Sequence, residues 1–149
     1  MFAKSLWLSL PLIVVFGQPA NDLKAKHDLK QMQGAWVLHA LEVNGKDVPA
    51  AKLQNTLLIV KGDDYRTTVK GQPLPGFRIT LDPSKKPAAM DMFQALPGQA
   101  EKKFKAIYLL DKDTLKICRG LTTEDERPGQ FATWPDTNYF VVTWKRQEK

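Results

Sequence analysis

Few side chains in this 149-residue chain have the types and spacing that catalysis or metal binding requires. His27 and His39 are the only histidines, and neither has a partner at the spacing of metal ligands. Cys118 is the only cysteine. A catalytic thiol needs a base and an oxyanion donor, and neither histidine stands in a recognisable arrangement with it. We therefore expect surface or packing roles for these three residues and no metal site.

The carboxylates are no more suggestive of a reaction. Asp63 and Asp64 could be imagined as an acid pair, but nothing in the pattern fixes such a pair around a substrate. Asp111 and Asp113 in "DKDTL" lack the glycine and the distal glutamate of a calcium loop, so a hairpin turn is the better interpretation. Phosphate-binding glycine loops and aromatic-basic RNA motifs are also absent from the sequence. The sequence thus predicts a non-enzymatic protein with no catalytic residues, no cofactor and no nucleic-acid partner.

Arg127 and Pro128 in "ERPGQF" fit loop anchoring better than substrate binding. An arginine can donate to several carbonyl oxygens at once, and a proline fixes the bend of the chain. We expect this pair to hold a loop in place.

The charge is basic, with 22 Lys and Arg against 16 Asp and Glu and a formal net charge of +6. The lysines are scattered in pairs among acidic residues, which favours a solvated surface over a nucleic-acid or acidic-partner patch. A chain of 149 residues is long enough for one core and too short for two ordinary domains.

The first twenty residues resemble a secretory signal peptide. Lys4 precedes an apolar run from Leu6 to Phe16, which is shorter than the roughly 20 residues that span a membrane as a helix. A buried N-terminal helix is the alternative interpretation. Small residues allow cleavage after Gly17 or after Ala20. We expect a periplasmic or secreted protein with no transmembrane span after cleavage and one domain over residues 21–149.

Apolar periodicity predicts a short helix over 21–32 and then an all-β domain. After Gly34 the apolar residues recur with period two, and turn signals such as "NGK" separate the runs. Eight short antiparallel strands in a flat sheet would leave two exposed edges, which closure into an up-and-down β-barrel removes. The expected strands are 35–43, 56–61, 64–70, 76–82, 88–93, 104–110, 114–119 and 139–146.

The strands flanking "DKDT" predict a hairpin. We expect Ile107, Leu109, Leu115 and Ile117 to line one of its faces. A helical turn is expected within 48–55, between the first two strands.

Three residues at the two ends of this domain resemble the lipocalin and calycin pattern. In that pattern a Gly-x-Trp begins the first strand and an arginine ends the last one, packing across the tryptophan to close the barrel. Gly34, Trp36 and Arg146 match it. The contact is physically reasonable, since a cation over an indole face gains about 0.5 to 2 kcal/mol.

A closer resemblance covers about 29–146. "LKQMQGAWVLHALEVNGKDVP", "ITLDPSKKPAAMDM", "AIYLLDKDTLKIC" and "RPGQF" are similar to successive blocks of a lipocalin-like family expanded in planctomycete bacteria, which has no established biochemical function. The resemblance implies the barrel and an extracytoplasmic setting, and it supplies no catalytic residues. A lysine-rich segment, "GQAEKKFKAIY", replaces a shorter polar loop of the family.

Two functions are compatible with such a barrel. It could bind a small hydrophobic ligand in its interior, or it could be filled by side chains and serve as an interaction or sensing module for an extracytoplasmic protein or envelope polymer. For the first, we expect the pocket to be lined by Phe77, Met90, Met92, Tyr108 and Phe140.

Overall fold

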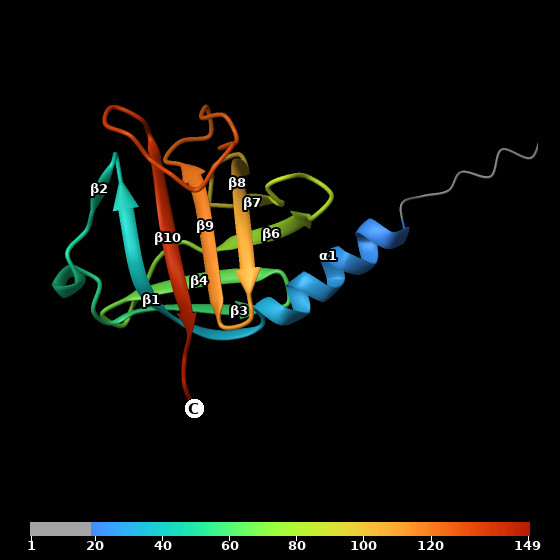
Figure 1. The fold of residues 1–149 in the computed structure, drawn as a ribbon, viewed down its shortest axis with the longest axis horizontal. Helices are drawn as coiled ribbons and strands as arrows, with labels where there is room; N and C mark the ends of the chain where they lie inside the picture. The colour runs from blue at the N-terminus through green and yellow to red at the C-terminus, as the bar shows by residue number, and fades with distance from the viewer. Residues whose placement is uncertain (1–18) are drawn as a thin grey trace, which may run out of the picture.

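The computed structural model describes residues 19–149, which form one helix and a single antiparallel sheet (Figure 1). The predicted signal peptide lies outside the described residues, apart from Pro19 and Ala20. Those two residues begin the helix α1 (Pro19–Met32). In the described part of the chain, no helix combines the length and apolarity needed to cross a membrane.

The sheet closes into a barrel of eight strands, as the sequence predicts. Neighbours in the chain are neighbours in the sheet, and β10 returns to pair with β1. Two further strands of two residues each, β2 and β5, lie at its rim. The barrel strands are β1 (Gly34–Val43), β3 (Thr56–Lys61), β4 (Asp64–Val69), β6 (Phe77–Asp82), β7 (Ala89–Gln94), β8 (Lys102–Asp111), β9 (Thr114–Gly120) and β10 (Tyr139–Arg146).

The barrel has one closed and one open end. The tight turns between β3 and β4 and between β8 and β9 lie at the closed end, next to the end of α1. The longer connections 44–55, 70–76, 95–101 and 121–138 gather at the open end. The connection 83–88, between β6 and β7, lies instead beside α1.

The "NG" turn after β1 forms as its residues require. Asn44 and Gly45 have φ values of 50° and 78°, the positive values that suit the tight turn of a two-residue hairpin. β2 (Lys46–Asp47) folds back on β1, and a single 3-10 turn (Ala50–Lys52) follows, as predicted within 48–55.

The closed end is sealed by the three residues that the family pattern singles out. The guanidinium carbon of Arg146 lies 4.2 Å from the centroid of the Trp36 ring. Trp36, which is fully buried, donates its indole N–H to the carbonyl of Met32 at 2.9 Å. Arg146 donates to the carbonyls of Gln33 and Gln31 at 2.9 and 2.7 Å. Together they satisfy carbonyl oxygens at the C-terminal end of α1, which have no partner inside the helix.

Gly34 is required at the start of β1 by its backbone conformation. Its φ of 112° lies where residues with a side chain are strained. The glycine thus lets the chain turn from α1 into the barrel beneath the arginine.

The predicted face of the β8–β9 hairpin is wrong for two of its four residues. Leu115 and Ile117 point into the barrel with Leu110 and Tyr108, their partners across the ladder. Ile107 pairs with Cys118 and lies on the outer face. Leu109 likewise points outward and is 51% exposed. The two-residue turn makes paired positions sum to an odd number, so odd positions on β8 share a face with even positions on β9.

The connection 121–138 folds over the outside of β8, β9 and β10. Its Phe131 packs on Ile107, Cys118 and Val141, which form a small second core. Arg127 anchors it, donating to the carbonyls of Met90 and Ala106 at 3.1 and 2.7 Å and pairing with Asp91 at 2.6 Å. The predicted anchoring role of Arg127 is therefore confirmed, and the anchor points are strands.

Candidate functional site

The open half of the barrel contains a cavity of about 470 Å³. This volume lies within the roughly 300 to 1,000 Å³ typical of small-molecule sites. Below it, the closed half is filled by side chains, with Met32, Trp36, Leu58 and Met90 all fully buried. The barrel is thus neither wholly hollow nor wholly filled.

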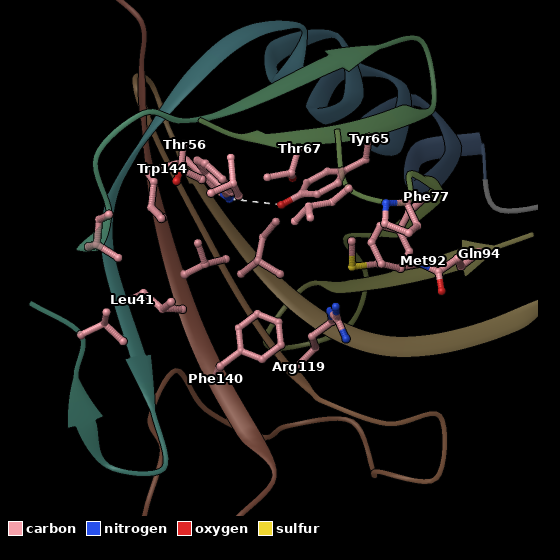
Figure 2. A pocket seen from close by; sticks show the side chains of 18 of the residues that line it. Leu41, Thr56, Tyr65, Thr67, Phe77, Met92, Gln94, Arg119, Phe140 and Trp144 are labelled. Carbon is pink, nitrogen blue, oxygen red and sulfur yellow. Dashed lines mark hydrogen bonds between the residues drawn. The ribbon is translucent and has the colours of Figure 1, made fainter. Parts of the chain in front are cut away.

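Side chains from every barrel strand except β8 line the cavity (Figure 2). Most of them are apolar and point inward because successive residues of a strand alternate between the two faces of the sheet. The lining residues are Leu38, Leu41, Val48, Lys52, Leu53, Thr56, Tyr65, Thr67, Val69, Leu74, Pro75, Phe77, Met92, Gln94, Ile117, Arg119, Phe140, Val142 and Trp144.

Three of the five residues expected to line a pocket do so. Phe77, Met92 and Phe140 come from β6, β7 and β10 and face the cavity (Figure 2). Met90 does not: it also faces inward but lies two residues nearer the closed end, where it is fully buried in the packed core. Its expected lining role is therefore wrong.

Tyr108 is also misplaced by the prediction. It lies low on β8, where its hydroxyl donates to the buried carboxylate of Asp28 on α1 at 2.7 Å. Burial and the Asp28 carboxylate together raise the pKa of Tyr108 well above its ordinary value. Lys24 pairs with the same carboxylate at 3.2 Å. Tyr108 therefore fastens the helix to the barrel and takes no part in the cavity.

The cavity opens beside a short seam between β4 and β6. These strands pair only through Asp64 with Arg78 and Tyr65 with Phe77. Toward the open end, the free edge of β4 pairs instead with β5 (Gln72–Pro73), which folds back from the turn at Lys70. The segment after β5 brings Leu74 and Pro75 to the mouth, and Leu74 is 49% exposed there. This side of the mouth is thus apolar.

Tyr65 and Trp144 form a polar contact inside the apolar wall. The indole N–H of Trp144 donates to the Tyr65 hydroxyl oxygen at 3.1 Å, and both residues are buried (Figure 2). Burial raises the pKa of Tyr65 to about 12, so the phenol is neutral at physiological pH. It can still donate its own proton to a ligand.

Arg119 is the principal polar group of the cavity, and the sequence reasoning missed it. Its guanidinium carbon lies 4.6 Å from the ring centroid of Phe104, 4.7 Å from that of Phe140 and 5.3 Å from that of Phe77. These rings come from three different strands and surround the cation with their electronegative faces. A sequence signal existed, because Arg119 continues the inward-facing series of Leu115 and Ile117 along β9.

The residues that could suggest catalysis are dispersed. His27 and His39 are exposed, on α1 and on the outer part of β1. Cys118 is fully buried outside the barrel, where burial raises the pKa of its thiol to about 11. Among residues 19–149, no three or more His, Cys, Asp or Glu side chains lie close enough together to hold a metal ion.

Comparison of the chain with protein-family models, with curated protein sequences and with solved structures gave no match. The resemblance to a lipocalin-like family therefore stays a prediction that rests on the motifs alone.

Proposed function

We propose that this protein is a non-enzymatic binder of a small apolar molecule, which occupies the cavity at the open end of the barrel. The observation that carries the proposal is the cavity itself, about 470 Å³ of space walled mainly by aliphatic and aromatic side chains. Apolar surface of this kind gains about 25 cal/mol for each Å² that a ligand removes from water. The alternative, a barrel filled throughout by side chains, does not account for that space.

The way the cavity is built also supports a ligand. The walls are strands of a closed sheet, which are stiff, and the mouth is formed by connecting loops, which can move to admit a molecule. The packed layer around Trp36 and Met90 makes the floor. The residues with the chemistry of nucleophiles and bases, Cys118 and the two histidines, contribute nothing to the cavity wall, so the proposal includes no reaction.

Titration with N-phenyl-1-naphthylamine, a neutral dye that fluoresces in apolar surroundings, tests the proposal. The variant Thr67→Trp places an indole inside the cavity from β4. It should weaken dye binding by about 5- to 150-fold, since overfilling an apolar site costs about 1 to 3 kcal/mol.

Thr68→Trp is the matched control, because it makes the same change at the next residue of β4, which faces outward. The control should bind the dye like the wild-type protein. If the wild-type protein does not bind the dye, or if both variants bind it equally well, the cavity is not a binding site.

We also propose that the protein acts outside the cytoplasm. This rests on the signal-peptide pattern of the first twenty residues and on the single cysteine, which leaves the domain independent of disulfides. N-terminal sequencing of the native protein should find a mature chain that begins between Gln18 and Asn21. Native protein that retains Met1 would contradict the proposal.

A further inference from the structure

We infer that the ligand is an amphiphile with a carboxylate head group, and that the Arg119 guanidinium binds this head group near the mouth of the cavity. The inference rests on the proposed function and adds the chemical class of the ligand. It is carried by the position, surroundings and unused hydrogen-bonding capacity of Arg119.

The charges on the cavity wall all have one sign. Among the described residues that line the cavity, the charged ones are Lys52 and Arg119, and no aspartate or glutamate is present. Lys52 is exposed at the rim, whereas Arg119 reaches inward from β9 (Figure 2). A ligand of complementary charge is therefore an anion.

Arg119 has donors to spare. One guanidinium N–H donates to the carbonyl of Gly120 at 2.8 Å. Within residues 19–149, no carboxylate forms an ion pair with it. Burial lowers the pKa of Arg119, but an arginine starts so far above neutrality that the group stays charged. The protein thus holds a partly buried cation whose remaining N–H groups have no hydrogen-bond acceptor among residues 19–149.

Partial burial of the Arg119 charge costs free energy that an anionic ligand can offset. A charge taken out of water loses hydration that three phenylalanine faces replace only in part, because each such contact contributes about 0.5 to 2 kcal/mol and offers no oxygen acceptor. The rings of Phe77, Phe104 and Phe140 hold the guanidinium in one position before a ligand binds. A fixed guanidinium presents paired N–H groups that match the two oxygens of a carboxylate.

The position of Arg119 also indicates how the carboxylate and the apolar chain of the ligand lie in the cavity. Arg119 is the second-last residue of β9 and Phe140 the second of β10, so both lie toward the open end. The wall below them is formed by Ile117, Val142 and Trp144. A carboxylate on Arg119 therefore stays close to water while an apolar chain extends along this wall.

Displacement of N-phenyl-1-naphthylamine by dodecanoate and by dodecan-1-ol tests the inference, because the two probes share a chain and differ in the head group. In Arg119→Met, dodecanoate should bind about 10- to 100-fold more weakly, the usual loss for a hydrogen bond to a charged group. Dodecan-1-ol should change by less than about threefold. Lys116→Met removes the same charge from the outward face of β9 and should leave both affinities unchanged.

The outcomes separate this inference from the proposed function. Equal changes for the two probes in Arg119→Met, or wild-type protein that binds dodecan-1-ol but not dodecanoate, would overturn the inference alone. Wild-type protein that binds neither the dye nor either probe would overturn both. Circular dichroism checks that Arg119→Met folds. If it does not, Arg119→Lys, which keeps the charge but loses the paired donors, should weaken dodecanoate binding and leave dodecan-1-ol binding unchanged.

Discussion

The guanidinium of Arg146, the last residue of β10, lies 4.2 Å from the ring centroid of Trp36 at the start of β1. This contact joins the two strands whose pairing closes the barrel. Both side chains also bind carbonyl oxygens at the end of α1, so one contact fixes the helix, the first strand and the last strand together. The conformation of the closed end therefore depends on residues 110 positions apart in the sequence (146 − 36).

Removing either partner of this contact should destabilise the fold. Trp36→Ala should lower the free energy of unfolding by about 3 to 5 kcal/mol, as a large buried aromatic, and Arg146→Ala should cost less. Because the side chains touch, a double-mutant cycle in denaturant should give a coupling of about 0.5 to 3 kcal/mol. Arg146→Lys is the control, because lysine keeps the positive charge but lacks the paired N–H groups of the guanidinium. Strict additivity of the two alanine variants would argue against the contact.

The hydrogen bond from Tyr108 to Asp28 should hold α1 against the barrel. Tyr108→Phe leaves the buried Asp28 carboxylate short of a donor, which should cost about 1 to 3 kcal/mol in urea unfolding. Tyr139→Phe is the matched control, since the Tyr139 hydroxyl binds the Glu126 carbonyl at an exposed position. Equal losses of unfolding free energy in the two variants would show that the hydrogen bond to Asp28 stabilises the fold no more than the exposed one does.

The thiol of Cys118 makes a pH-dependent contribution to stability. Its pKa is about 11 in the folded protein, against about 8.5 for an unfolded thiol. Between these values the unfolded state binds fewer protons, so the free energy of unfolding falls as pH rises. Urea melts between pH 8 and 10 should therefore show the wild-type protein losing stability faster than Cys118→Ala. A constant difference between the two proteins across this range would contradict the assignment.

Arg127 should control the order of the connection 121–138. Arg127→Met removes hydrogen bonds to Met90 and Ala106 and the ion pair with Asp91, and should cost about 1 to 3 kcal/mol. Hydrogen exchange in this connection should become faster. Arg78→Met breaks a 3.6 Å ion pair with Glu101 and a contact with the Phe93 ring at 4.3 Å, neither of which involves this connection, so it should leave that exchange unchanged. Unaltered exchange in Arg127→Met would mean that the packing of Phe131 and the hydrogen bonds of Thr133 with Glu42 and Gly45 hold the connection without Arg127.

The strands could be predicted from sequence because their alternation is local. All eight expected runs overlap barrel strands, and the closing residues Gly34, Trp36 and Arg146 meet as the family pattern implies. The predicted inner face of the β8–β9 hairpin was wrong because Ile107 and Leu109 are apolar residues on the outer face. The connection 121–138 covers Ile107, whereas Leu109 is exposed. Alternation within a strand does not reveal which loop folds over it.

The cavity was harder to predict because its depth depends on distant contacts. Met90 and Met92 alternate identically on β7, and only the packing of Trp36 beneath them decides that one is core and the other is wall. Arg119 meets phenylalanines from 15, 21 and 42 positions away (119 − 104, 140 − 119, 119 − 77), a grouping set by the barrel's register. The inward position of Arg119 on β9 could be predicted from the sequence, but its three phenylalanine partners could not.

Native mass spectrometry tests the central claim, a ligand in the cavity, most directly. Protein purified from its own source without denaturation should carry a small adduct that organic extraction removes, and Thr67→Trp protein prepared in the same way should carry less of it. A bare protein mass, both as purified and after incubation with dodecan-1-ol and dodecanoate, would contradict the account.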